Sequence, residues 1–203
     1  MIKTLLKLLL LVFLFAGNIA PAAAFAPIKT GLILQPDTLK PRTDVTGRVY
    51  PTPPPNPLRM FYLQRSPNIN ALVYDINIDK KTGKPDEDSP LHGYWLRYAE
   101  GHGEPSEFTY MQRKFAYGVI SKALGNDNYD IRLVSYKKIP FTLMKGADGK
   151  YHIFATVAKK QMLLQKVFIQ IDGGTFWLPN VIFVELKGTD PVTGKEVTER
   201  FKP

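Results

Sequence analysis

Short segments in which apolar and polar residues alternate follow one another from Leu58 to the end of the chain. The segment 71–79 (ALVYDINID) shows the pattern most clearly, and a period of two residues is typical of a strand that buries one face. Turn-forming residues separate the segments, as in GNDN at 125–128 and GADG at 146–149, which favours hairpins. Because no helical crossover lies between successive segments, we expect antiparallel pairing.

The fold class that follows is mostly β, with about nine or ten strands and one short helix. Two architectures fit the pattern: an antiparallel up-and-down barrel of the lipocalin or calycin type, and a two-sheet sandwich. The dipeptide Gly173-Gly174 is expected to end the longest strand. The strands are expected near 60–65, 71–79, 92–99, 117–124, 129–136, 141–145, 150–158, 161–172, 180–187 and 195–202.

The segment 106–116 is the best candidate for the helix. Ser106, which follows a proline, is typical of an N-cap. Thr109 and Gln112 offer an alternative start one turn later, because their spacing matches a capping box. The apolar residues of the segment would share one face by their three- and four-residue spacing; they are Phe108, Met111 and Phe115.

The N-terminus has the three parts of a secretory signal peptide. Two lysines give a positive start, residues 8–16 form an unbroken apolar run, and Ala22-Ala23-Ala24 supplies the small residues that a signal peptidase recognises. The alternative is a membrane anchor, but a spanning helix needs about 20 apolar residues, and Gly17 ends the run. We therefore predict a signal peptide over 1–24, a periplasmic or secreted mature protein, and no transmembrane span after cleavage.

A proline-rich stretch, 25–57, follows the signal peptide and holds eight of the 17 prolines. Proline favours an extended conformation and cannot join the interior of a sheet. We interpret the stretch as an extended arm, either a spacer that holds the domain away from a surface or a docking segment. Residues 58–203 would then form a single β domain.

Cysteine is absent, so an exported domain must be stabilised by its core without disulfides. Zinc sites built on cysteine, redox motifs and cysteine nucleophiles are excluded. The 27 basic and 18 acidic residues give a net charge of +9, and removal of Lys3 and Lys7 leaves +7. Most lysine pairs lie near expected strand ends, where they would discourage edge-to-edge aggregation or attract the protein to an anionic lipid or polysaccharide surface. Nucleic acid is a poor partner for an exported protein without a basic helix.

The first candidate binding group is Arg65, Asn68 and Asn70, in a loop between two expected strands. A guanidinium fork beside two amides is suited to a carboxylate, a phosphate or a sugar. In the alternative interpretation the asparagines only shape the turn, and Arg65 pairs with a carboxylate such as Asp75.

Two further groups surround aromatic residues. Trp95 and Arg97 lie on one face of an expected strand, and Trp95 with Tyr98 would form a stacking platform for a ligand, unless these rings belong to the core. Gln112 and Arg113 lie in the expected helix, where exposure to solvent is the default.

Signs of catalysis are weak. The loop 100–104 (EGHGE) has the residue types of a metal site, but its two glycines are typical of a turn, and we predict no metal and no cofactor. The motifs GxSxG, HExxH and the P-loop are absent. An enzyme would have to use carboxylates such as Asp75 and Glu100 with His92 or His102 as acid and base.

Three strings, FYLQRSPNINALVYDINID, GYWLRYAE and YMQRKFAYG, together resemble an uncharacterised family of exported bacterial proteins, the domain of unknown function 4833. The resemblance covers the chain from about Leu58 to the end. It implies an exported, periplasmic domain and supplies no reaction. It directs attention to the candidate residues that lie in the matching strings: Arg65, Asn68, Asn70, Trp95, Arg97, Gln112 and Arg113.

These observations favour a non-enzymatic envelope protein that binds an anionic or sugar-like ligand, or a partner protein, near its strands rich in aromatic residues and arginine. A hydrolase acting on envelope polymers is the first alternative. A structural envelope component without a small ligand is the second.

Overall fold

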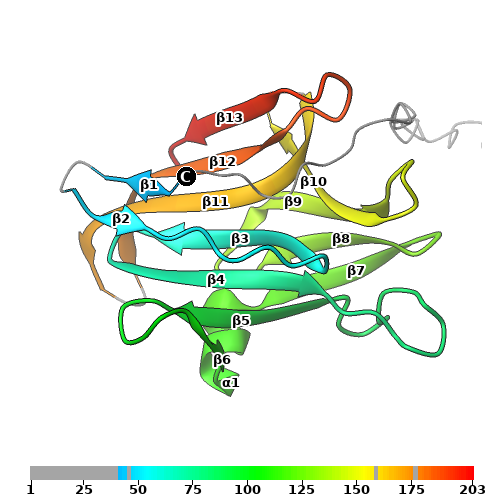
Figure 1. The fold of residues 1–203 in the computed structure, drawn as a ribbon, viewed down its shortest axis with the longest axis horizontal. Helices are drawn as coiled ribbons and strands as arrows, with labels where there is room; N and C mark the ends of the chain where they lie inside the picture. Colours follow the sequence, from blue (N-terminus) through cyan, green and yellow to red (C-terminus); the bar gives the residue numbers. More distant parts are fainter. Residues whose placement is uncertain (1–40, 45–46, 158–159, 176–177) are drawn as a thin grey trace, which may run out of the picture.

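Eleven strands form one large sheet, and two short strands pair with each other beside it (Figure 1). The computed structural model describes residues 41–44, 47–157, 160–175 and 178–203. The fold is mostly β with one short helix, as predicted. The strands of the sheet are β3 (Arg59–Arg65), β4 (Asn68–Ile76), β5 (Leu91–Arg97), β6 (Glu104–Glu107), β7 (Val119–Gly125), β8 (Asn128–Leu133), β9 (Tyr136–Lys145), β10 (Tyr151–Val157), β11 (Lys160–Gly174), β12 (Pro179–Thr189) and β13 (Glu196–Phe201).

The order of neighbouring strands is β6-β5-β4-β3-β11-β10-β9-β8-β7, and β12 and β13 continue from the other edge of β11. Ten of these strands lie where the alternating pattern predicted strands. The sheet curls into a half-barrel, so that its two ends face each other across one core (Figure 1).

One pairing departs from the antiparallel prediction. The first part of β11 pairs antiparallel with β10 as far as Leu163, and Lys166 to Ile169 on the same edge then pair parallel with β3. The opposite edge of β11 pairs with β12. The 15-residue length of β11 lets one strand join both halves of the sheet, and closure of the curl brings β3 to it in the parallel direction.

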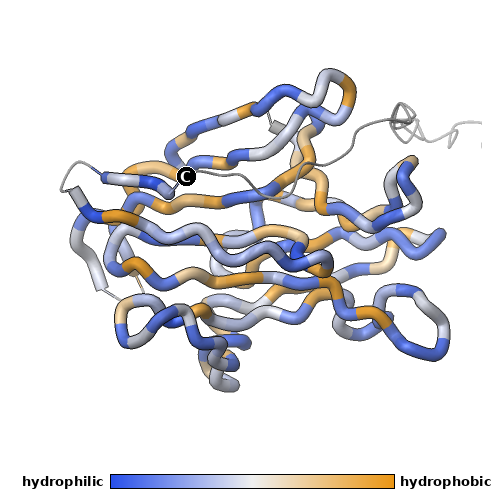
Figure 2. Tube along the Cα trace, viewed as in Figure 1, coloured by the Kyte–Doolittle hydropathy of each residue, from blue (hydrophilic) through white to orange (hydrophobic). Residues whose placement is uncertain are grey.

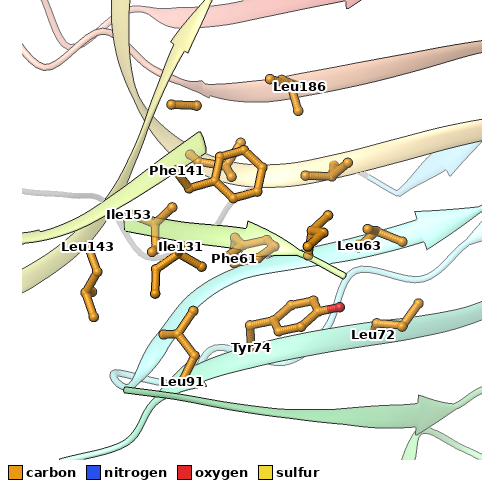
Figure 3. Packing of buried hydrophobic residues seen from close by; sticks show 14 of the residues in the cluster. Phe61, Leu63, Leu72, Tyr74, Leu91, Ile131, Phe141, Leu143, Ile153 and Leu186 are labelled. Atoms are coloured by element: carbon orange, nitrogen blue, oxygen red, sulfur yellow. The ribbon is translucent and has the colours of Figure 1, made fainter. Parts of the chain in front are cut away.

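The apolar core fills the inside of this curl. Phe61 stacks on Tyr74 with ring centroids 4.5 Å apart and meets Phe141 edge-on at 5.6 Å, so side chains from the two halves of the sheet are in contact (Figure 3). Figure 2 shows the corresponding pattern, with apolar residues along the strands and hydrophilic residues in the loop after β4. The core therefore depends on pairing across the curl.

The expected helix over 106–116 is shorter than predicted, and its first part is strand. Glu104–Glu107 pairs with β5 as β6, because the free edge of β5 offers hydrogen bonds to this segment. The helix begins after Thr109, in the alternative capping box with Gln112. It consists of α1 (Tyr110–Gln112) and the π-helical η1 (Arg113–Tyr117).

Two details of the turns bear on the predictions. The turn between β7 and β8 holds Asn126 and Asp127 at positive φ, 53° and 58°, as a two-residue hairpin requires. The longest strand, β11, ends at the Gly173-Gly174 dipeptide as expected, but it includes both glycines and so runs two residues past the predicted end at 172. Both glycines have positive φ and lie beyond a register irregularity after Gln170, so they bend the end of the strand.

The described part of the proline-rich arm lies against the sheet. Its strands β1 (Arg42–Thr43) and β2 (Val49–Tyr50) pair with each other. Tyr50 is fully buried and meets the Phe168 ring edge-on at 5.2 Å, and Gln64 Nε2 donates to the Pro51 carbonyl at 2.7 Å. Residues 1–40 lie outside the described part, so the signal peptide stays a prediction. Among the described residues, no helix is long and apolar enough to cross a membrane.

Candidate functional site

A pocket of about 380 Å³ opens at the end of the sheet where β3 ends and β12 begins. Its walls come from β3, β4, η1, the turn between β8 and β9, β11 and β12. Most of the lining is apolar, and Arg65 carries the one charged side chain among the described lining residues. The lining consists of Leu63, Arg65, Tyr74, Phe115, Ala116, Tyr117, Leu133, Val134, Ser135, Tyr136, Ile169, Ile171, Pro179, Val181, Val184 and Pro203.

Arg65 is the last residue of β3 and lies on the core face of the strand with Leu63. Its guanidinium carbon lies 4.8 Å from the centroid of the Tyr117 ring and 5.7 Å from that of the Trp95 ring. Its Nε is buried and has no hydrogen-bond partner among the described residues. Cation–π contacts hold the guanidinium, while one of its donors is left unsatisfied beside the pocket.

Trp95 joins Arg65 to Arg97. The indole is buried in the core and meets Tyr117 edge-on at 5.0 Å. The Arg97 guanidinium carbon lies 4.7 Å from the Trp95 ring centroid, and its Nη1 is 3.9 Å from Glu100 Oε1. Two positive groups therefore share one aromatic ring, but only Arg65 lines the pocket.

A hydrogen bond holds Tyr74, a residue of β4, in the lining of the pocket. Its hydroxyl donates a hydrogen bond to the Tyr117 carbonyl at 2.8 Å, which connects β4 to η1. Burial raises the pKa of Tyr74 well above its usual value, and the nearby Arg65 charge only partly opposes this. The hydroxyl therefore stays neutral, and it does not act as an internal anion for Arg65.

Asn68 and Asn70 shape the neighbouring turn. Asn68 Oδ1 accepts from the Asn70 backbone N–H at 3.1 Å. The Asn70 amide is buried, donates to Glu100 Oε2 at 2.9 Å and accepts from the Ala99 backbone N–H at 2.7 Å. Both asparagines thus have partners within the protein, and neither lines the pocket.

Gln112 and Arg113 are also outside the pocket. Gln112 Oε1 accepts from the Thr109 backbone N–H at 3.0 Å, which completes the capping box. Arg113 Nη2 lies 3.4 Å from Glu107, whose carboxylate also meets His92 Nε2 at 2.9 Å. Of the seven predicted residues, the structure brings together Arg65, Trp95 and Arg97.

Three of the groups considered for catalysis, Asp75, Glu100 and His92, have structural partners. Asp75 is buried on the outer face of β4 and accepts from Arg59 Nε, Asn56 Nδ2 and the Tyr94 hydroxyl, each at 2.7 or 2.8 Å. His92 meets Glu107, as described above. In the part of the chain that the structure describes, no group of three or more histidine and acidic side chains is arranged to hold a metal ion.

Sequence reasoning missed most of the pocket. The lining residues of β11 and β12 are ordinary apolar positions, and Val134 and Ser135 are ordinary residues of the turn after β8; whether they meet depends on long-range pairing. Tyr117 lies in one of the strings that resemble the family, but nothing in its local pattern indicated contact with Arg65.

Comparison with known proteins identifies the family of the chain but not its activity. No curated protein matches the chain, and no solved structure matches it. A family model described as a domain of unknown function, DUF4833, matches residues 61–200. This range holds most of β3, all of β4 to β12, most of β13 and every predicted site residue. The chain therefore belongs to the DUF4833 family, as its sequence strings predicted.

Proposed function

We propose that this chain is a non-enzymatic binding protein of the cell envelope, exported by the predicted signal peptide. It holds a small, mostly apolar molecule with one carboxylate or similar anionic group in the pocket described above. The anionic group pairs with Arg65, and the apolar part lies against the β11 and β12 side of the pocket. The half-barrel acts as a lipocalin-like barrel would, with its ligand in the open end.

The observation that carries the proposal is the unsatisfied Nε of Arg65 beside an apolar pocket. Leaving a buried donor without a partner costs about 1–3 kcal/mol. A carboxylate is the complementary group for a guanidinium, because it accepts two parallel hydrogen bonds. A ligand carboxylate would satisfy the donor and neutralise the charge together.

The pocket supports a ligand that is larger than an ion. Its volume of about 380 Å³ lies within the usual range for small-molecule sites, which are mostly apolar with a few polar groups that fix orientation. Apolar surface that enters the pocket gains about 25 cal/mol per Å². A bare anion would leave this surface unused, so we favour a molecule with an apolar body.

A binding titration tests the proposal. The mature protein, with Phe25 as its first residue if cleavage follows Ala24, is titrated with decanoate and with decanol by calorimetry. We expect decanoate to bind more tightly than decanol. The Arg65→Gln variant should lose about 10-fold or more in affinity for decanoate, because a hydrogen bond to a charged group is worth about 1.5–3 kcal/mol.

Arg97→Gln is the matched control, because Arg97 contacts the same indole ring without lining the pocket. It should change the affinity for decanoate by less than about 3-fold, since its charge is partly screened by solvent. Two results would show that Arg65 does not bind the anionic group specifically. One is equal affinity of wild type and Arg65→Gln for decanoate, and the other is an equal loss of this affinity in both arginine variants.

A further inference from the structure

An exposed apolar and basic surface lies next to the pocket, on the short helix. Tyr110 is 70% exposed, Met111 52% and Phe115 48%. Phe115 also lines the pocket, so the apolar surface continues from the inside of the pocket to the outside of the protein. On the β12 side of the same pocket, Leu178 is 80% exposed and precedes the lining residue Pro179.

The charge of this helix complements an anionic surface. Lys114 Nζ donates to the Tyr110 hydroxyl at 3.0 Å and lies 5.4 Å from the centroids of both the Tyr110 and Phe115 rings. Arg113 is exposed beside it. Aromatic rings with lysine or arginine among them are typical of the membrane–water interface, where the rings enter the headgroup region and the cations meet anionic lipids.

From these contacts we propose that the helix Tyr110–Tyr117, together with Leu178, docks the mouth of the pocket on an anionic lipid bilayer. The inference rests on the proposed function in one respect: a ligand with an apolar body is poorly soluble, and a docked mouth would exchange it directly with the membrane. A polysaccharide is the weaker partner, because its hydrated surface would not cover the exposed Tyr110, Met111 and Leu178 side chains.

Vesicle co-sedimentation tests the docking surface separately from the pocket. The probes are vesicles of phosphatidylcholine alone and vesicles with about a third phosphatidylglycerol. Wild type should partition onto the anionic vesicles more than 10-fold better than onto the neutral ones. Lys114→Glu should weaken partitioning about 30-fold, because it changes the charge by two units and each unit near an anionic surface is worth about 1 kcal/mol. The double variant Tyr110→Ser/Met111→Ser should weaken it at least 5-fold.

Matched controls separate the two proposals. Lys80→Glu makes the same charge change in the exposed loop after β4, at the opposite end of the sheet from Arg65, and should lose less than about 2-fold. Arg65→Gln should still bind vesicles, so loss of ligand and loss of membrane binding are distinguishable. Lys114→Glu and the double variant should in turn keep their affinity for decanoate, because these residues do not line the pocket.

Three results would overturn the inference. The first is equal binding to neutral and anionic vesicles. The second is equal loss in Lys80→Glu and Lys114→Glu, which would indicate net charge alone. The third is binding to soluble dextran sulfate as tight as to vesicles, with no effect of the double variant, which would indicate a polysaccharide surface.

Discussion

The contact of Arg65 with Trp95 and Tyr117 shows how one charged side chain is held in an apolar site. Each ring offers a negative face to the guanidinium, and the rings are themselves fixed in the core by edge-on contacts, as at 5.0 Å between Trp95 and Tyr117. The guanidinium is therefore positioned before any ligand arrives. Pre-positioning matters because a ligand then need not order the side chain on binding.

Part of this cluster could be predicted from sequence. The two-residue period of β5 placed Trp95 and Arg97 on one face, and both lie there, in contact. The roles of Asn68 and Asn70 could not be decided from the sequence. The local pattern is the same for an asparagine that binds a ligand and for one that hydrogen-bonds to a neighbouring loop. The partners of Asn70, which are Glu100 and Ala99, lie about 30 residues further along the chain.

The helix shows how pairing overrides a local start signal. Pro105 and Ser106 are typical of a helix start, yet they pair with Leu96 and Trp95 in β6. A strand at the free edge of β5 satisfies backbone groups that would otherwise face solvent. The next start signal, Thr109 with Gln112, then begins the helix. The local sequence held both signals, and only the position of β5 selects between them.

This selection leads to a prediction for the capping box. Thr109→Ala should lower the free energy of unfolding by about 1 kcal/mol, because the Gln112 backbone N–H loses its acceptor. Ser106→Ala should change it by less than about 0.5 kcal/mol, since Ser106 lies in β6 rather than at the helix start. Urea unfolding followed by circular dichroism measures both. A larger loss in Ser106→Ala would mean that the helix begins at the earlier signal.

Across the whole molecule, the closure of the sheet is what sequence patterns left undetermined. The parallel register between β3 and β11 joins residues about 100 positions apart, such as Tyr62 and Lys166. Alternation indicates which face of a strand is buried, but it does not indicate which strand will lie at its edge. The pocket exists only after this closure, which explains why its apolar lining was not predicted.

A mostly buried carboxylate of β12 holds the short strand β1 against the sheet. Glu185, in β12, contacts Arg42 of β1 and accepts from Arg200 Nη2 of β13 at 2.7 Å. Burial alone would raise the pKa of Glu185, but the hydrogen bonds and positive charges of Arg200 and Arg42 lower it below its usual value. The ionised form is therefore stabilised by folding.

The sign of the pH dependence follows. The pKa of Glu185 is lower in the folded chain than in the unfolded chain, where it is near 4.5. Ionised Glu185 therefore makes its full contribution to the free energy of unfolding above that pH, and this contribution is lost as the pH falls through the pKa of the folded chain. Glu185→Gln should lower the free energy of unfolding by about 1.5–3 kcal/mol at pH 7. It should also lose less stability than wild type on acidification from pH 7 to 3.

Glu196→Gln is the control for this prediction, because the Glu196 side chain, which pairs with Lys187, is 60% exposed, against 12% for Glu185. It should cost less than about 1 kcal/mol. Urea midpoints at pH 7, 5 and 3 give the comparison. Parallel loss of stability in wild type and Glu185→Gln on acidification would show that other carboxylates govern the acid response.

The crystal structure of the mature protein with decanoate tests ligand binding by Arg65. We expect the decanoate carboxylate within hydrogen-bond distance of Arg65 Nε and the alkyl chain along the apolar lining of the pocket, against Ile169 and Val181. A carboxylate bound elsewhere, with Arg65 Nε still unpartnered and the pocket filled by side chains, would contradict the proposed function.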